Sequence, residues 1–224
     1  MATLYIVGTP IGNLEDISKR ALRILSEVDL ILCEDTRVTR KLLERFGIKT
    51  ETRSYHQHSK LKKTEEVVQL LKEGKNLALV SDAGTPGISD PGGKLVESVF
   101  SELADGVKII PVPGTNALIT AASVSGFPID RFLFLGFPPV KKKRKKFFEE
   151  IINSTYPVIF FESPHRIIKS LTELRTLDRQ VPIVVCRELT KKFETTYRGT
   201  AEEVLGQMKE SEIRGEFVVI VKGK

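Results

Sequence analysis

The chain has 224 residues, of which 41% are hydrophobic and 29% are charged, the balance of an ordinary globular protein. This composition excludes collagen-like, low-complexity and wholly disordered chains, and the length is that of one large domain or two small ones. The 35 basic and 29 acidic side chains give a formal net charge of +6, which suits a polyanionic partner but does not identify one.

In the first half of the chain, short apolar runs alternate with stretches of helical periodicity. Residues 4–7 form an apolar run that stops at Gly8, which is typical of a buried strand. The elements expected after it are a helix through Ile17, Ala21, Leu25 and Val28, a strand at 30–33, a helix through Leu42, Leu43 and Phe46, a helix through Val67, Val68 and Leu71 that stops at Gly74, a strand at 77–80, a helix at 95–103 and a strand at 107–110. Such alternation predicts a parallel sheet covered by helices.

Residues 126–130 form a turn-rich joint, after which the pattern restarts. The elements expected beyond it are strands at 132–135, 158–161, 181–186, near 195–197 and at 217–221, with helices around 147–152, from Pro164 and around 204–208. No internal repeat is visible. We therefore predict an α/β protein of two α/β domains, residues 1–125 and 126–224.

Three loops rich in glycine and proline follow predicted strands of the first domain, at residues 8–13, 81–93 and 113–116. In open α/β sheets, ligands bind outside the carboxyl ends of the strands, where such loops gather. A single loop of this kind is most often a plain turn, but three at equivalent positions favour a binding site. None matches the GxGxxG or GxxxxGK[ST] pattern, so neither a dinucleotide-binding motif nor a P-loop is predicted.

No group of His, Cys, Asp and Glu shows good metal-ligand spacing. His56 and His58 come nearest, and a polar loop is the favoured interpretation, so no metal is expected. Cys33 and Cys186 lie far apart, each at the end of an apolar run, and are interpreted as buried reduced thiols.

The apolar runs are too short for a membrane-spanning helix, and the N-terminus lacks the basic start and long apolar stretch of a signal peptide. We expect a cytoplasmic protein without a membrane partner.

Six basic residues follow one another at positions 141–146. A solvated loop or helix start is the simplest explanation of a charge run. However, basic side chains at a helix N-terminus oppose the helix dipole, so they do not stabilise a helix that begins there. Contact with phosphates is therefore the favoured interpretation.

Several segments together resemble the ribosomal-RNA-modifying members of the tetrapyrrole-methylase (class III) family of S-adenosylmethionine-dependent methyltransferases. They are LYIVGTPIGNLEDIS (4–18), LCEDTR (32–37), SDAGTPGISDPG (81–92), VPGTNA (112–117), FESPHR (161–166) and CRELTK (186–191). The motifs run in order over essentially the whole chain, and those at 81–92 and 161–166 are highly specific. The resemblance implies 2′-O-methylation of a cytidine in the decoding region of 16S rRNA, with the assembled small ribosomal subunit as substrate. It also implies a homodimer, with S-adenosylmethionine in the cleft between the two α/β domains.

The resemblance further implies which residues bind each ligand. The cofactor would be bound by Ile11, Gly84, Thr85, Ile88, Thr115, Asn116, Phe161, Leu189, Gly215 and Glu216. The RNA would be bound by Glu34, Thr36, Arg37 and His56, and by Lys141, Lys142, Arg144 and Lys145 of the basic run.

Methyl transfer to a ribose hydroxyl is an in-line displacement, and a base that accepts the hydroxyl proton accelerates it by about 10²–10⁴-fold. Asp35, Asp82 and Glu162 are the carboxylates best placed by sequence. Asp35 is the favoured base, because it follows the second strand on the side that the family uses for substrate. A helix cap or a loop-holding hydrogen bond is the structural alternative for each carboxylate.

Two other functions stay open. A small-molecule methylase acting on a tetrapyrrole precursor would share the fold and the cofactor, but the basic run and the FESPHR motif disfavour it. A non-catalytic RNA-binding protein would need only the charge and would leave the three loops unexplained.

Overall fold

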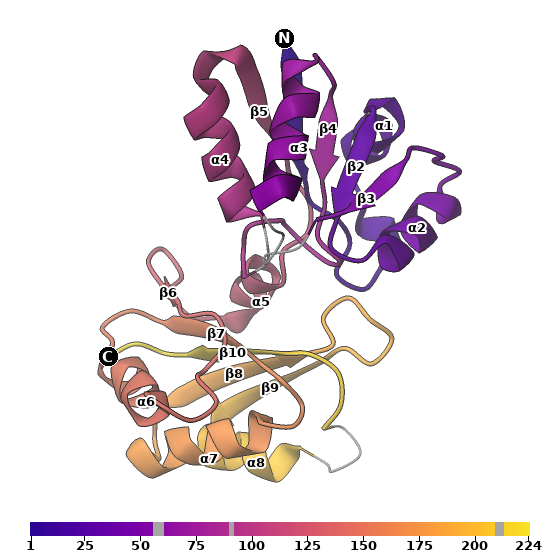
Figure 1. The fold of residues 1–224 in the computed structure, drawn as a ribbon. Helices are drawn as coiled ribbons and strands as arrows, with labels where there is room; N and C mark the ends of the chain where they lie inside the picture. Colours follow the sequence, from indigo (N-terminus) through magenta and orange to yellow (C-terminus); the bar gives the residue numbers. More distant parts are fainter. Residues whose placement is uncertain (56–60, 90–91, 209–212) are drawn as a thin grey trace. The chain divides into compact units, whose positions relative to one another are not determined.

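The computed structural model describes residues 1–55, 61–89, 92–208 and 213–224, and the chain divides into two compact units, Met1–Asn116 and Ala117–Lys224 (Figure 1). We expected a boundary after residue 125, but the second unit begins before helix α5 (Ala117–Ser125). This helix packs against strands β7 (Val158–Glu162) and β10 (Phe217–Val221), and it therefore belongs to the second unit.

The first unit is built on a five-stranded sheet in the order β3-β2-β4-β1-β5, in which every neighbouring pair is parallel. Its strands are β1 (Ala2–Val7), β2 (Leu30–Cys33), β3 (Thr52–Ser54), β4 (Leu77–Leu79) and β5 (Val107–Val112). Its helices are α1 (Lys19–Glu27), α2 (Thr36–Arg45), α3 (Leu61–Lys72) and α4 (Gly93–Leu103), with short 3-10 turns η1 (Leu14–Asp16) and η2 (Ala104–Gly106). The predicted parallel α/β sheet is confirmed.

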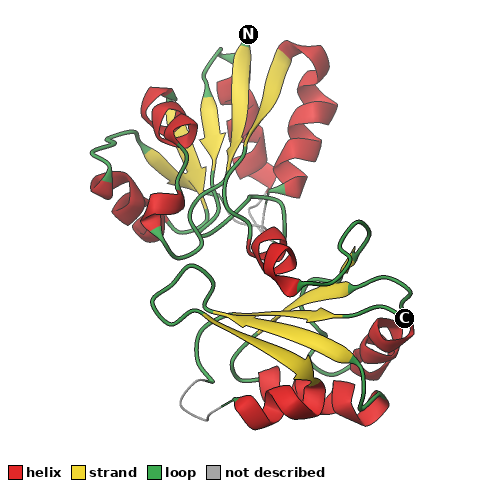
Figure 2. Ribbon diagram, turned by 180° about the vertical axis from the view of Figure 1, so that it is seen from behind, coloured by secondary structure: helices red, strands yellow, loops and turns green. Residues whose placement is uncertain are grey.

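Helices cover both faces of this sheet (Figure 2), and each face has its own apolar core. Ile24 and Leu25 of α1 pack with Ile31 of β2 on one face. Leu71 of α3 and Leu95 of α4 pack on the opposite face. Because both faces are buried, the strands read as continuous apolar runs in the sequence.

The second unit contains a mixed sheet in the order β6-β7-β10-β8-β9. Its remaining strands are β6 (Leu133–Phe134), β8 (Pro182–Arg187) and β9 (Thr195–Thr200), and its remaining helices are α6 (Arg144–Asn153), α7 (Ile167–Leu177) and α8 (Ala201–Gln207). Only β6 and β7 pair in parallel, whereas β10 runs antiparallel to both β7 and β8, and β9 runs antiparallel to β8. A wholly parallel sheet is impossible here, because β8 and β9 are joined by a short loop without a crossover helix.

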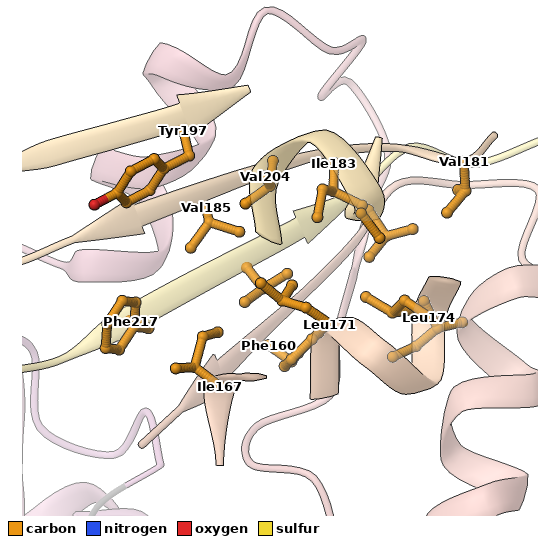
Figure 3. Packing of buried hydrophobic residues seen from close by; sticks show 14 of the residues in the cluster. Phe160, Ile167, Leu171, Leu174, Val181, Ile183, Val185, Tyr197, Val204 and Phe217 are labelled. Carbon is orange, nitrogen blue, oxygen red and sulfur yellow. The ribbon is translucent and has the colours of Figure 1, made fainter. Parts of the chain in front are cut away.

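Large side chains from α7 and α8 fill one face of the second sheet (Figure 3). Leu171 and Leu174 of α7 meet Phe160 of β7 and Phe217 of β10, and all four side chains are fully or nearly fully buried. Cys33 and Cys186 are buried free thiols, as predicted, and burial raises the pKa of each thiol above its usual value.

Each sheet gathers loops at one edge. In the first unit the carboxyl ends of all five strands share an edge because the sheet is parallel. In the second unit the register pairs Phe217 at the start of β10 with Glu162 and Arg187 at the ends of β7 and β8. No helix in the described part of the chain is long and apolar enough to cross a membrane.

Candidate functional site

The three glycine- and proline-rich loops of the first unit lie together, because they follow the adjacent strands β4, β1 and β5. Thr9 and Gly84 exchange two backbone hydrogen bonds, of 2.9 and 3.1 Å. The Thr115 hydroxyl donates to the Thr9 carbonyl oxygen at 2.5 Å, and the Thr85 hydroxyl donates to the Thr115 carbonyl oxygen at 3.0 Å. These hydrogen bonds fix the three loops to one another.

Glycine is required where these loops approach most closely. A Cβ atom on Gly114 would lie 2.6 Å from the carbonyl oxygen of Gly8, and one on Gly8 would lie 2.8 Å from the Gly114 Cα atom. Gly84 has φ of +85°, and a Cβ atom there would lie 3.3 Å from the Ile11 side chain. The loops therefore present backbone groups and small side chains, which suits close approach of a polar ligand.

Four of the predicted cofactor residues lie in these three connected loops: Ile11, Gly84, Thr85 and Thr115. Ile88 lies further along the second loop with 41% of its surface exposed, and Asn116 follows Thr115 directly. Thr9, which the sequence analysis did not single out, is the residue that connects the three loops, since it bonds to both Gly84 and Thr115.

A separate depression lies at the carboxyl ends of β2 and β3 in the first unit. It is lined by Glu34, Asp35, Thr36, Arg37, Ser54 and Asp82. Three of the predicted RNA-binding residues therefore share one surface with Asp35, and Ser54 is an addition that the sequence did not indicate. His56, the fourth predicted residue, lies outside the described residues.

Asp35 is the N-cap of α2, because its carboxylate accepts the backbone N–H of Arg37 at 2.8 Å. The same carboxylate forms an ion pair with the Arg37 guanidinium at 2.6 Å. These contacts hold the pKa of Asp35 far below its usual range. The contacts of Asp35 are those of a helix cap, the structural alternative considered for it, and its role as the base stays a prediction.

Asp82 and Glu162, the other carboxylates considered, also have structural partners. Asp82 accepts the backbone N–H of Asp35 at 2.9 Å, which connects the loops after β4 and β2. Glu162 is 2% exposed, and it accepts hydrogen bonds from Ser163 N and from the Ser170 hydroxyl.

In the second unit, Glu188 brings predicted cofactor residues together. Its carboxylate accepts from the Lys191 ammonium at 2.9 Å and from the backbone N–H of Glu216 at 3.0 Å. Gly215 lies against it, where a Cβ atom would clash with the Glu188 carboxylate. Glu188 itself has φ of +53°, an uncommon conformation for a residue other than glycine. Sequence reasoning missed Glu188, although it lies within the CRELTK motif.

Leu189 and Thr190 follow Glu188 in the same loop. Leu189 is buried, and the buried Thr190 hydroxyl has no hydrogen-bond partner among the described residues. A buried polar atom without a partner is rare in folded proteins, and a bound polar ligand would supply one. The unpartnered Thr190 hydroxyl therefore fits the prediction that this loop binds a cofactor.

Phe161, the remaining predicted cofactor residue, lies near the end of β7. Its ring centroid is 5.0 Å from that of Phe134 and 5.5 Å from that of Phe137. The neighbouring β6–α6 loop begins beside it, since the Phe161 N–H donates to the Gly136 carbonyl oxygen at 2.9 Å.

The basic run divides into exposed and buried members. All five lysines are exposed, including the predicted RNA ligands Lys141, Lys142 and Lys145. Arg144, by contrast, is 4% exposed and forms an ion pair with Glu173 at 2.8 Å. The expectation that Arg144 contacts RNA is therefore wrong, because its guanidinium is turned into the second unit and already paired.

The buried Glu162 explains the FESPHR motif in structural terms. Its carboxylate pairs with Arg166 at 2.9 Å and lies 3.9 Å from the Arg144 guanidinium. Arg166 also donates to the carbonyl oxygen of Pro138, and Arg144 donates to that of Pro139, each at 3.1 Å. Two arginines anchored by one buried acid thus hold the loop that precedes the lysines.

In residues 1–55, 61–89, 92–208 and 213–224, no group of three or more His, Cys, Asp or Glu side chains is arranged to hold a metal ion. The first unit gathers loop backbone and small hydroxyl side chains, and the second unit carries the exposed lysines.

The fold is shared with a known class of enzyme. The structure aligns with the solved uroporphyrin-III-C-methyltransferase from Thermus thermophilus with a TM-score of 0.68 and 17% identity, covering 99% of this chain and 94% of that one. The family model for tetrapyrrole (corrin/porphyrin) methylases matches residues 3–205. The architecture is thus that of a methyltransferase with two α/β domains.

Relatives with higher sequence identity indicate which group within this class the chain resembles. A protein named ribosomal RNA small subunit methyltransferase I from Halalkalibacterium halodurans is 47% identical, covering 99% of this chain and 76% of the relative. A protein of the same name from Thermotoga maritima is 43% identical, covering 100% of both chains. The chain belongs to the tetrapyrrole methylase family, in the group of relatives that carry this name.

Proposed function

We propose that this protein is an S-adenosylmethionine-dependent methyltransferase of ribosomal RNA in the small ribosomal subunit, and that it methylates the 2′-oxygen of a cytidine in the decoding region. The observation that carries the proposal is the 43% identity, over the full length of both chains, to a relative named ribosomal RNA small subunit methyltransferase I. The five exposed lysines support a polyanionic substrate. We further propose that the protein acts as a cytoplasmic homodimer.

The cofactor is proposed to bind to the connected loops of the first unit, and to the loop of Leu189 and the Gly215–Glu216 turn of the second. S-adenosylmethionine, when bound, supplies a methyl group on a positively charged sulfur. The Thr9, Gly84 and Thr115 loops offer backbone groups in fixed positions, because they are hydrogen-bonded to one another. Holding the reacting groups in line in this way can account for about 7–11 kcal/mol of the barrier.

Asp35 is proposed to act by position rather than by accepting the hydroxyl proton. Its carboxylate starts α2 and orients the Arg37 guanidinium, which is largely exposed at the depression. A cation held there can contact an RNA phosphate, whereas the carboxylate itself is already fully engaged.

Substitutions at Asp35 distinguish these roles. Asparagine is as good an N-cap as aspartate, so we expect Asp35→Asn to fold normally and to lose far less turnover than the about 10²–10⁴-fold that removal of a general base costs. Asp35→Ala removes the cap as well and should lower the melting temperature. Methyl-transfer rates and thermal denaturation of both variants provide the test. A large drop in kcat for Asp35→Asn, with cofactor affinity unchanged, would restore Asp35 as the base.

The proposed activity is tested with labelled S-adenosylmethionine, unmodified small ribosomal subunits and naked rRNA. A methylated 2′-oxygen cannot attack the adjacent phosphate, so the modified nucleotide resists alkaline cleavage and can be mapped. We expect one protected cytidine in the decoding region. Transfer to a tetrapyrrole precursor instead would establish the small-molecule alternative, and failure to bind the cofactor would favour a non-catalytic RNA-binding protein.

A further inference from the structure

The loop between β6 and α6 carries an exposed aromatic ring beside the lysine run. Phe137 is 53% exposed, although its ring packs against Phe161 with centroids 5.5 Å apart. Phe161 in turn meets Phe134 edge-on at 5.0 Å. One side of the Phe137 ring is therefore supported by a row of aromatic side chains, while much of its surface remains open to solvent.

The same loop is held at its backbone from inside the second unit. Arg166 and Arg144 donate to the consecutive carbonyl oxygens of Pro138 and Pro139, and both arginines are near the buried Glu162. Phe137 directly precedes this fixed pair of prolines, so its position is determined by the buried network. An aromatic ring fixed in this way loses little conformational entropy when it binds a ligand.

The exposed lysines that follow the ring in the chain indicate an anionic ligand. Lys141, Lys142 and Lys143 follow the proline pair, and Lys145 and Lys146 are exposed on the first turn of α6. An open aromatic ring that the chain follows, four to nine residues later, with five exposed lysines matches a nucleic acid with unpaired bases, because the phosphates can meet the lysines while a base stacks on the ring. Bases inside a duplex are stacked on one another and cannot use such a ring.

We infer that Phe137, in the loop that Arg144 and Arg166 hold at its backbone, is a base-stacking residue that binds an unpaired nucleotide of the RNA substrate. This inference rests on the proposed function and names a feature of the substrate, an unpaired nucleotide next to the phosphates that the lysines contact.

The test measures RNA binding by fluorescence anisotropy over a series of salt concentrations. The probes are a short unstructured oligoribonucleotide and a perfect RNA duplex that contains the same sequence. We expect Phe137→Ala to weaken binding of the unstructured probe by about 5- to 150-fold, the range found for loss of one stacked base. Binding of the duplex and the salt dependence should stay unchanged, and Phe137→Trp should retain affinity.

Two further variants separate stacking from charge and from general surface effects. Lys141→Gln combined with Lys142→Gln should reduce the slope of log affinity against log salt by about 0.7 for each phosphate that the protein no longer neutralises. Phe100→Ala is the matched control, since Phe100 is 70% exposed on α4 of the first unit and should not affect either probe.

The inference is overturned if Phe137→Ala binds the unstructured probe as Phe100→Ala does, or if it weakens duplex binding equally. In either case, methyl transfer to small subunits by the unmodified protein would leave the proposed function standing. If the unmodified protein neither binds RNA nor transfers methyl groups to small subunits, the proposed function fails as well.

Discussion

Replacing Glu162 with glutamine is expected to lower the free energy of unfolding by about 3–5 kcal/mol, the cost of removing one partner from a buried ion pair. The Glu162 side chain is fully buried. It forms an ion pair with Arg166 at 2.9 Å, and it accepts hydrogen bonds from Ser163 N at 2.8 Å and from the Ser170 hydroxyl at 2.5 Å. Glutamine has nearly the same shape but no charge, and its amide nitrogen would face donors. The Arg166 guanidinium would then lose its anionic partner in a partly buried position.

The second ion pair of Arg144 offsets only part of this expected loss of stability. Its guanidinium keeps Glu173 at 2.8 Å after the substitution, but Glu173 lies at the surface with about a third of its side chain exposed. The Ser170 hydroxyl, which Arg144 contacts at 2.8 Å, would lose the acceptor that now orients it. The network is therefore expected to weaken as a unit rather than at one bond.

Urea denaturation of Glu162→Gln provides the measurement, with Glu202→Gln as the matched control. Glu202 pairs with Arg175 in the same unit, but its side chain is 63% exposed. Exposed ion pairs contribute about 0–1 kcal/mol, so the control should unfold almost as the unmodified protein does. Equal stability of the two variants would mean that the buried network contributes little to folding.

The fold of the first unit was predictable because its strands are buried on both faces and stand out as apolar runs. One strand and one α-helix, β3 of the first unit and α5 of the second, were missed for identifiable reasons. Strand β3 has only three residues, Thr52–Ser54, all polar and at the edge of the sheet. Helix α5 (ALITAASVS) has no charged residue, and its threonine and serines are interspersed with apolar residues, so it shows little of the amphipathic pattern by which a helix is recognised in a sequence.

Strand direction in the second unit could not be read from periodicity. Residue pattern reveals which faces of a strand are buried, but not whether the neighbouring strand runs parallel. The final strand, β10, inserts between β7 and β8, which precede it in the chain by many residues. Only the close connection between β8 and β9 carried a sequence signal for an antiparallel pair.

At the candidate site, sequence spacing could have corrected one mistake. Arg144 lies four residues before Phe148 and seven before Ile151, so helical periodicity places it on the buried face of α6. A run of six basic residues hid this spacing. Glu188, in contrast, had no comparable signal, because its place in the structure depends on a backbone conformation with positive φ and on contacts with residues 191 and 216.

Substitution of Gly114 by alanine is expected to abolish most cofactor binding, because it separates the two loops on which the proposed site depends. The added Cβ atom would lie 2.6 to 2.8 Å from three backbone atoms of Gly8. Neither loop can yield easily, since Gly8 N donates to the Val112 carbonyl oxygen at 3.0 Å and Thr115 bonds to Thr9. Overpacking of this kind costs about 1–3 kcal/mol of stability.

Calorimetric titration with S-adenosylmethionine measures the effect, with Gly106→Ala as the control in the same unit. A Cβ atom on Gly106 would meet nothing within 4 Å, so the control should bind the cofactor normally. If Gly114→Ala proves too unstable to titrate, Thr85→Val removes only the 3.0 Å bond to the Thr115 carbonyl oxygen and leaves the glycines in place. Normal affinity in both variants would mean that the cofactor binds elsewhere. The affinity of a ligand bound to these loops depends on the contacts that hold the loops together.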